Sequence, residues 1–335
     1  MNQPDNGTRM MSVKLPTTTL GEHGPVVGSQ GFGCMAMATG YYGETDEAAA
    51  RATLDRALDL GVTLFDTADV YGGGANEEFI APFVQANRDR IVIATKFGLV
   101  HRDGKTWIDN RPEYIRQSLE GSLRRLGVDT IDLYYMHRRT PDVPMADSVG
   151  TMADLVREGK IRYLGLSEVS AAELREAHAI HPITALQTEW SLFSREVEAE
   201  IVPAAAEHGI ALVPYSPLGR GQLSGATQGV QLQASDVRQH MARFSEENRA
   251  ANDALIAGIS NLASRHDSTP AQVALAWLHH QAAVHSLTIV PIPGTRKPSR
   301  VEENVGGATL RLADEDFDAL DQLADAVRGD RSRTI

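Results

Sequence analysis

A recurring pattern of hydrophobic and polar positions divides most of the chain into alternating helices and short strands. Four times, an amphipathic segment ends at a glycine and a short apolar run follows at once, as in LDRALDLG followed by VTLFDTA. A glycine just past a helix supplies the left-handed residue that closes it. We assign this role to Gly61, Gly127, Gly159 and Gly209. The runs that follow these glycines predict strands at 62–68, 131–137, 161–167 and 210–216.

Further apolar runs complete a set of eight strands. These additional strands are expected near residues 30–34, 91–95, 185–189 and 288–292. Helical periodicity predicts helices near 45–60, 75–86, 111–126, 147–158, 171–180, 196–208, 270–280 and 298–305. Each strand is short and apolar on both faces, as a parallel sheet covered by helices requires. Eight strands alternating with helices therefore predict an α/β fold, a (β/α)8 TIM barrel.

Several segments fall outside this alternation. Short β-like pieces in residues 12–28 predict an N-terminal β-hairpin that closes the barrel bottom, and two extra helices at 246–265 and 314–328 should pack outside the barrel. Residues 221–245 are rich in Gly, Gln and Ser without firm periodicity, and a loop of that length in a compact domain is usually functional or mobile. The expected organisation is a disordered tail at 1–11, one barrel domain at 12–328 and a C-terminal tail at 329–335.

Composition excludes some classes of function. The 335 residues are 42% hydrophobic and 23% charged, and the net charge of −12 argues against binding to nucleic acid. The single cysteine, Cys34, excludes an internal disulfide and fits a reducing compartment. No apolar run approaches the roughly 20 residues of a membrane span, and no leader opens the sequence. We expect a cytoplasmic protein without a nucleic-acid or membrane partner, whereas its oligomeric state is left open.

Polar residues stand at the ends of three predicted strands. These are Asp66, Lys96 and His137, and Tyr71 follows five residues after the aspartate. The carboxyl ends of barrel strands converge on one mouth, where barrel active sites lie. A phenol is a weak acid with a pKa of about 10, but a nearby ammonium favours its ionised form, and a carboxylate can hold that ammonium in place. With an imidazole to orient a carbonyl oxygen, the four residues predict proton delivery during carbonyl reduction.

Other interpretations of single motifs are weaker. Taken alone, Asp66 could cap the next helix and Lys96 could be an exposed edge lysine, but burial does not require such residues at three strand ends. The stretch Gly31–Ala36 has the form G-x-G-x-x-A of a dinucleotide fingerprint, yet no helix follows it. The paired histidines His279 and His280 lack partners at metal-binding spacing, so no metal site is predicted.

Seven phrases of the sequence together resemble one enzyme family. FDTADVYG, TKFG, IDLYYMHR, GLSEVS, ALQTEWSLFSR, VPYSPLGRG and IPGTRKPSRVEEN are similar, in order and spacing, to the aldo-keto reductase family over about residues 12–328. GFGCMAMA and ITALQTEWSL resemble the branch that contains plant perakine reductase and related bacterial reductases. The resemblance implies a barrel that binds NADPH across its mouth and assigns the catalytic positions to Asp66, Tyr71, Lys96 and His137.

The resemblance also implies a set of cofactor contacts. Ser167 and Gln187 take the positions that bind the nicotinamide carboxamide, and Tyr215 takes that of the aromatic ring stacked on the nicotinamide. Glu168 stands where the family usually has asparagine. The pyrophosphate is expected along Ser216, Leu218, Gly219 and Gly221, the adenine beside Glu303 and Asn304, and further cofactor contacts from Gly33, Cys34, Met35, Asp66 and Gly294.

The loop after the last predicted strand indicates which cofactor is used. Thr295 is expected at a helix start, where free backbone N–H groups favour a phosphate. Arg296, Lys297 and Arg300 add positive charge in an otherwise acidic chain, and the arginines can bind a phosphate with two hydrogen bonds. A monophosphate fits this loop better than a bare ribose, so NADPH is predicted. The family often has Lys-Ser at Gly294–Thr295, so phosphate binding here must depend on the arginines.

The substrate is defined only by class. Tyr71, His137, Met35, Trp107 and Trp190 are candidate pocket residues, and the aromatic rings suggest an apolar or aryl carbonyl compound. The same family also includes potassium-channel β-subunits, which resemble reductases but act as partner-bound regulators that can sense the state of the cofactor. A cofactor-sensing regulatory subunit therefore stands as the alternative to an NADPH-dependent reductase of aldehydes or reactive ketones.

Overall fold

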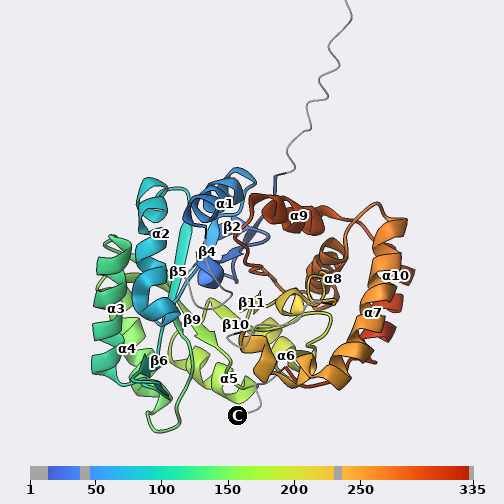
Figure 1. Cartoon of the computed structure of the whole chain (residues 1–335). Coiled ribbons are helices and arrows are strands. Elements are labelled where there is room, and N and C mark those ends of the chain that lie inside the picture. The colour runs from blue at the N-terminus through green and yellow to red at the C-terminus, as the bar shows by residue number, and fades with distance from the viewer. Residues whose placement is uncertain (1–13, 38–45, 230–235, 332–335) are drawn as a thin grey trace, which may run out of the picture.

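Parallel strands build the centre of the computed structural model, which describes residues 14–37, 46–229 and 236–331. A seven-stranded sheet runs in the order β11–β10–β9–β8–β5–β4–β3 (Figure 1). Its members are β3 (Phe32–Gly33), β4 (Leu64–Asp66), β5 (Val92–Phe97), β8 (Ile131–Met136), β9 (Ile161–Ser167), β10 (Ala185–Glu189) and β11 (Ala211–Tyr215). Every pairing within this sheet is parallel, as the short runs that are apolar on both faces predicted.

Residues 288–292 close the sheet into a barrel. The amide of Val290 donates to the carbonyl of Leu212 at 2.9 Å on one side, and the amide of Gly31 donates to the carbonyl of Pro291 at 2.9 Å on the other. The expected eighth strand is reduced to an isolated bridge, because prolines in the PIP sequence have no N–H to donate to a ladder. The chain thus forms the predicted (β/α)8 barrel with a bridging segment in place of one regular strand.

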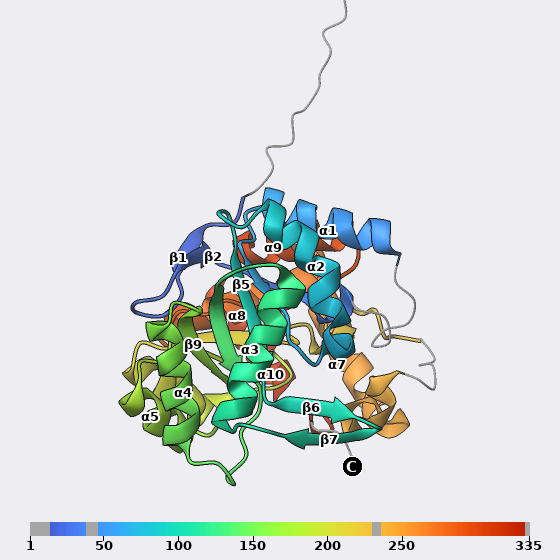
Figure 2. The ribbon, with the colours of Figure 1, turned by 90° about the vertical axis from the view of Figure 1, so that its left-hand side faces the viewer.

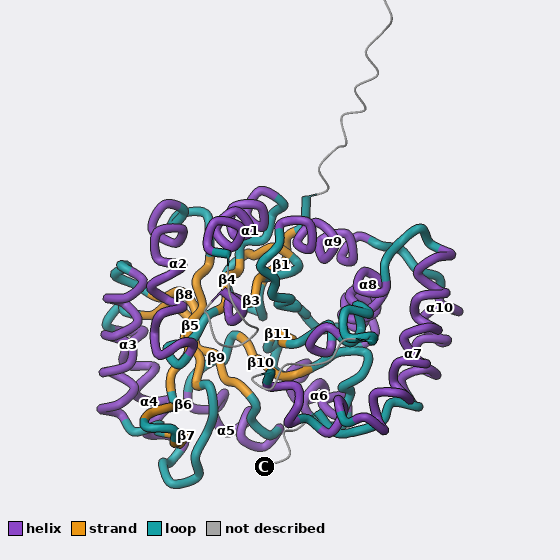
Figure 3. The backbone as a smooth tube through the Cα atoms, viewed as in Figure 1, coloured by secondary structure: helices purple, strands orange, loops and turns teal. Residues whose placement is uncertain are grey.

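Helices surround the strands (Figure 3). Those that follow barrel strands are α1 (Glu47–Asp59), α2 (Ala75–Ala86), α3 (Pro112–Leu126), α4 (Met145–Arg157), α5 (Ala171–Ile180), α6 (Ile201–Glu207), α8 (Pro270–Val284) and α9 (Pro298–Thr309). The two predicted extra helices are α7 (Glu246–Arg265) and α10 (Asp314–Ala324), which pack against each other outside α8, at the right of Figure 1. Among the described residues, no helix combines the length and the hydropathy needed to cross a bilayer.

Local sequence signals explain where these helices begin and end. Ser170 and Thr269 each form a capping box with the residue three positions later, which satisfies free N–H groups at the starts of α5 and α8. The four glycines expected to close helices, Gly61, Gly127, Gly159 and Gly209, all have positive φ. The helix expected at 196–208 is divided into a 3-10 turn, η3 (Glu196–Glu198), and α6.

Two hairpins flank the barrel. The predicted hairpin is β1 (Thr17–Thr19) with β2 (Val26–Gly28), and it inserts Leu20 and Val27 into the apolar core inside the barrel with Leu64, Leu133 and Val213. A second hairpin, β6 (Leu99–Arg102) with β7 (Lys105–Ile108), follows β5 and was not predicted; Figure 2 shows it at the edge of the molecule. The first hairpin therefore closes one end of the barrel, and the other end is left for a site.

The long segment after β11 contains short 3-10 turns instead of a regular helix. They are η4 (Gly219–Gly221), η5 (Val237–His240) and η6 (Ala242–Phe244), and residues 230–235 lie outside the described residues. This agrees with the lack of periodicity in the sequence. The proposed division into tails and one domain stays a prediction, and residues 1–13 and 332–335 lie outside the described residues as well.

Candidate active site

Three strand ends bring the predicted catalytic residues together at the carboxyl end of the barrel. Asp66 ends β4, Lys96 lies in β5, and His137 follows β8, while Tyr71 begins the 3-10 turn η2 (Tyr71–Gly74). The ammonium of Lys96 is fully buried; it forms an ion pair with Asp66, donates to the carbonyl of Thr67 at 2.7 Å and lies 3.5 Å from the Tyr71 hydroxyl. The amine thus joins the carboxylate and the phenol directly.

The electrostatics of this group keep the amine charged. Burial by itself would lower the pKa of Lys96, but the adjacent Asp66 carboxylate and the Tyr71 hydroxyl outweigh burial and raise the pKa above its usual value. The second carboxylate oxygen of Asp66 accepts a hydrogen bond of 2.8 Å from Gln187 Nε2. The predicted cofactor residue Gln187 therefore also fixes the aspartate.

His137 is held in its neutral form. Burial, followed by the charges of Lys96 and Arg138, places the pKa of His137 well below its usual range. Its ring lies 5.9 Å from the Tyr71 ring, centroid to centroid, at 86°. Its Nδ1 atom is buried and has no hydrogen-bond partner among the described residues. A neutral imidazole beside the phenol can offer a hydrogen bond without competing for the positive charge.

A buried asparagine aligns the first two strand ends around this site. Asn76, in α2, donates to the carbonyl of Cys34 at 2.7 Å and accepts from the Thr67 hydroxyl at 2.7 Å. Cys34 begins the turn η1 (Cys34–Met37), and burial raises the pKa of its thiol well above its usual value. Cys34 is fully buried, whereas Met35 next to it is half-buried, and their contacts with a cofactor stay predictions.

The residues expected to contact the nicotinamide lie on neighbouring strands. Ser167 at the end of β9 is in register with Gln187 of β10, and Tyr215 ends β11 beside Glu189. The Ser167 hydroxyl accepts a hydrogen bond of 3.2 Å from Arg138. The chain then turns through Ser216, which has a left-handed φ of 49°, into η4. The expected pyrophosphate residues Leu218, Gly219 and Gly221 fall in and around this turn.

Gln222, directly after η4, was not predicted as a site residue. Its side chain is 1% exposed, yet neither its amide oxygen nor its amide nitrogen has a hydrogen-bond partner among the described residues. An unpaired buried amide is costly, so it indicates a missing polar partner. The signal in the sequence is one polar residue between Gly221 and the buried Leu223, and such a signal is too weak to identify a buried site residue.

The ends of the first and last barrel segments approach very closely. A Cβ atom on Gly294 would lie 2.5 Å from the carbonyl oxygen of Gly33, so no side chain fits there. Thr295 is buried and its hydroxyl accepts from the amide of Lys297 at 3.2 Å, and α9 begins only at Pro298. The expectation that Thr295 stands at the helix start is therefore off by three residues, because proline takes the first helical position.

The charges expected near a phosphate surround the first turn of α9. This turn contains no acidic residue, and Arg300 is exposed on it, with Lys297 at the N-cap. Positive charges at a helix N-terminus oppose the helix dipole unless an anion binds there. Asn304, one of the two expected adenine residues, is buried in the same helix, and Glu303 is half-buried.

The candidate pocket residues do not all lie at the mouth. Tyr71 and His137 are neighbours, and Trp107 of β7 is 42% exposed on the second hairpin. Trp190 is fully buried; its indole N–H donates to Glu198 at 3.0 Å and its ring packs 5.8 Å from that of His285. Trp190 is thus a core residue behind β10, and we do not retain it as a pocket residue.

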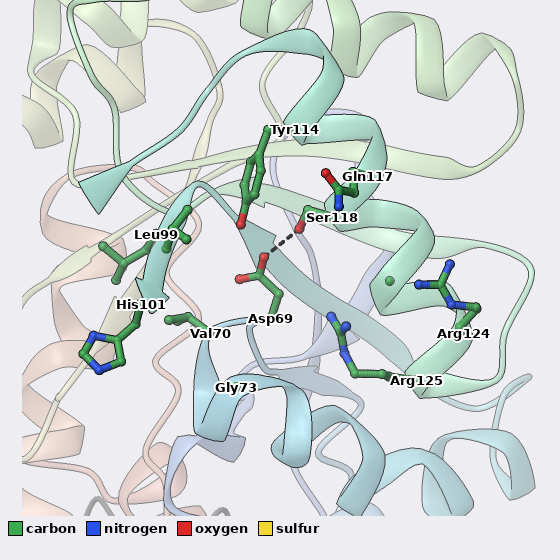
Figure 4. A pocket seen from close by; sticks show the side chains of 12 residues that line it. Asp69, Val70, Gly73, Leu99, His101, Tyr114, Gln117, Ser118, Arg124 and Arg125 are labelled. Carbon is green, nitrogen blue, oxygen red and sulfur yellow. Dashed lines mark hydrogen bonds between the residues drawn. The ribbon is translucent and has the colours of Figure 1, made fainter. Parts of the chain in front are cut away.

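A cavity of about 340 Å³ lies between η2, α3 and β6, and none of the four predicted catalytic residues is among those that line it (Figure 4). Asp69, two residues before Tyr71, lines it and accepts a hydrogen bond of 2.6 Å from the Ser118 hydroxyl. The other carboxylate oxygen is buried and has no hydrogen-bond partner among the described residues. Burial raises the pKa of Asp69 to about 7. The hydrogen bond from Ser118 lowers this pKa, whereas the charge of Glu77 raises it further.

A parallel α/β barrel with a buried Lys–Asp pair, a tyrosine and a histidine at its carboxyl end defines a barrel enzyme that handles protons at a small-molecule site. Residues 31–325 match the Aldo/keto reductase family, and the chain belongs to this family. The family assignment indicates oxidoreduction of carbonyl compounds with a nicotinamide cofactor. The expected family is therefore confirmed.

Solved structures agree with this assignment over nearly the whole chain. The glycerol dehydrogenase AKR11B4 from Gluconobacter oxydans is 28% identical with a TM-score of 0.81, and the match covers 94% of this chain and 95% of that one. The aldo-keto reductase AKR11C1 from Bacillus halodurans, in its holo form, is also 28% identical with a TM-score of 0.74, covering 93% and 97%.

Proposed function

We propose that this chain reduces aldehydes or reactive ketones of small molecules to alcohols with NADPH, and that Tyr71 is the general acid. The observation that carries this proposal is the position of the Lys96 ammonium, which contacts the Asp66 carboxylate and lies 3.5 Å from the Tyr71 hydroxyl. A fixed cation at that distance stabilises the phenolate that remains after proton transfer. The half-buried phenol is the member of the group that substrate can reach.

In this mechanism the residues of the chain position and polarise the carbonyl group. Tyr71 donates its proton to the carbonyl oxygen, and Lys96 stabilises the resulting negative charge while Asp66 holds the amine in place. The neutral imidazole of His137 orients the same oxygen through a hydrogen bond. When bound, the nicotinamide supplies the hydride.

The proposed cofactor site fits a dinucleotide on two counts. The amide of Gln222 is buried without a partner among the described residues, beside the turn where the pyrophosphate is proposed to pass. Ser167, Gln187 and Tyr215 lie on the three neighbouring strands β9, β10 and β11, where one flat ring with a carboxamide could contact all three. We therefore propose Gln222 as an additional cofactor contact beside Ser216, Leu218, Gly219 and Gly221.

The preference for NADPH over NADH rests on the last loop. Arg296, Lys297 and Arg300 lie at the start of a helix whose first turn has no acidic residue. Such a concentration of positive charge suits the 2′-phosphate that distinguishes the two cofactors. Within the family, the phrases GFGCMAMA and ITALQTEWSL lead us to place the chain in the perakine-reductase-like branch.

The proposal is tested by measuring NADPH consumption with a panel of aldehydes, ketones and pyridoxal. We expect turnover by the wild type and a loss of about 10²-fold or more in Tyr71→Phe, with NADPH affinity nearly unchanged, because only the proton donor is removed. Near-wild-type turnover by Tyr71→Phe would refute the assignment of the acid. Tight NADPH binding without turnover of any compound, together with a co-purifying partner, would instead support the regulatory-subunit alternative.

A further inference from the structure

The residue that replaces the family's usual asparagine is part of an unpredicted ion pair. Glu168 directly follows Ser167 and has a left-handed φ of 53°. Its carboxylate oxygen Oε1 accepts from the Thr188 hydroxyl at 3.0 Å and from the amide of Glu189 at 2.9 Å. These bonds fix the carboxylate at the ends of β9 and β10, next to the proposed carboxamide contact Ser167.

The partner of this carboxylate comes from the far end of the chain. Arg331 donates from Nη1 and Nη2 to the two oxygens of Glu168, at 3.1 and 2.9 Å, so the guanidinium binds with two parallel hydrogen bonds. The same guanidinium lies 3.9 Å from the carboxylate of Glu189, which is buried. Arg331 thus pairs with the Glu168 carboxylate and shares the Glu189 carboxylate with Arg220, which also lies 3.9 Å from it.

The segment before Arg331 is tied to the body of the protein. Asn252 in α7 donates to the carbonyl of Arg328 and accepts from its amide, both at 2.9 Å. Arg243 donates to the carbonyl of Gly329 at 3.3 Å. The path of the chain therefore directs Arg331 to the mouth of the barrel, where its side chain is 24% exposed.

These charges act on the proposed nicotinamide site. Burial raises the pKa of Tyr215 above its usual value, and the charges of Glu168 and Glu189 raise it further while Arg138 and Arg331 oppose them. The ring of Tyr215 is the proposed stacking partner of the nicotinamide, so a bound nicotinamide would experience the same field. The oxidised nicotinamide ring carries a positive charge that the reduced ring lacks.

This inference rests on the proposed function. We infer that Arg331 determines how strongly the protein discriminates between the oxidised cofactor, NADP+, and the reduced cofactor, NADPH. Its guanidinium offsets the Glu168 carboxylate and, together with Arg220, the Glu189 carboxylate; without Arg331 these negative charges would favour the positively charged oxidised ring over the reduced one. Two unit charges about 10 Å apart, at an effective dielectric of about 20, interact strongly enough to change an affinity by about tenfold. A charge that acts on NADP+ but not on NADPH would change the ratio of their dissociation constants by that factor. Because Arg331 is partly exposed and screened, we expect a change of about three- to tenfold.

The test measures the dissociation constants of NADP+ and NADPH by titration calorimetry, without substrate. Arg331→Gln removes a positive charge and should strengthen NADP+ binding, so the dissociation constant of NADP+ divided by that of NADPH should fall about three- to tenfold. Glu168→Gln removes a negative charge and should raise this ratio. The double variant removes one charge of each sign and should return to the wild-type ratio. Arg331→Lys keeps the charge and should stay close to wild type, as should the matched control Arg328→Gln, which removes an exposed cation from the same segment.

Each outcome decides between the charge effect and a structural role. An unchanged ratio in Arg331→Gln, or equal weakening of both cofactor forms, would overturn the inference and leave the proposed reductase intact. A shift of the same size in Arg328→Gln would also overturn it, because the effect would then not depend on the Glu168 pair. If the wild type binds neither form, the proposed function itself fails.

Discussion

Replacing Lys96 with methionine isolates the charge at the centre of the proposed site. The side chains of Lys96 and Asp66 are 0% and 4% exposed, so neither can turn to solvent when its partner is removed. Methionine keeps most of the length and volume of lysine, which limits the loss of packing. The Asp66 carboxylate would retain the 2.8 Å hydrogen bond from Gln187 but no longer its ion pair. Lys96→Met therefore leaves a buried carboxylate without its cation.

The expected loss of stability is large. Removing one partner of a buried ion pair costs about 3–5 kcal/mol. With an unfolding entropy of about 2.1 cal/mol/K per residue, the 335 residues give about 0.7 kcal/mol per degree, so the Tm should fall by about 4–7 °C. An uncompensated buried carboxylate has a raised pKa in the folded state, so this loss should grow as pH rises from about 4 and shrink as pH falls. Calorimetry at several pH values measures both effects.

A second variant separates charge from packing. Adding Asp66→Asn to Lys96→Met neutralises both groups, so the double variant should regain most of the lost stability. Turnover should remain low in both variants because Tyr71 lacks the neighbouring cation. If Lys96→Met unfolds at the wild-type temperature, or if the double variant is no more stable than the single one, the ion pair is not the source of stability inferred here.

Three further predictions concern the neighbouring sites. Arg296→Ala and Arg300→Ala should each weaken the binding of NADPH by about tenfold or more, since a charged contact contributes roughly 1.5–3 kcal/mol, and should barely change the binding of NADH. Equal losses of affinity for both cofactors would mean that these arginines only support the fold. Gln222→Leu should weaken the binding of both cofactors in titrations. It should preserve or raise the Tm of the free protein, because it replaces an unpaired buried amide with an apolar side chain. Unchanged cofactor affinity would contradict the proposed role of Gln222. Asp69→Asn should raise the Tm at pH 8 but not at pH 5, in parallel thermal scans.

The sign of the Asp69 effect follows from its pKa. Burial raises the pKa of this carboxyl to about 7 in the folded protein, above the value of about 3.9 expected when it is unfolded. Between these values the folded state binds the proton more tightly, so stability decreases as pH rises through this window and is lowest above it. Asp69→Asn removes this buried charge and should therefore stabilise the folded protein only at high pH, where the carboxyl group is ionised. A difference in Tm between Asp69→Asn and the wild type that does not change with pH would contradict the raised pKa of Asp69.

The sequence alone determined the barrel, its extra helices and the group of four polar residues. Those features depend on short-range signals: an amphipathic helix, a left-handed glycine such as Gly127, and an apolar run that ends at a polar residue such as Asp66. Because parallel strands of a barrel end at one mouth, the sequence pattern was enough to place together strand ends that are distant along the chain. The same signals predicted the start of α9 at residue 298, where the structure has it, but missed the β6–β7 hairpin.

The tertiary structure decided which side chains meet across long sequence separations. Nothing local in the sequence pairs Arg331 with Glu168, 163 residues earlier, or shows that Gln222 is buried without a partner among the described residues. Periodicity also could not show that Trp190 packs in the core, because an aromatic residue after a strand suits a pocket and a core equally well. Strand order and helix ends are encoded locally, whereas burial and charge pairing arise only when the barrel closes.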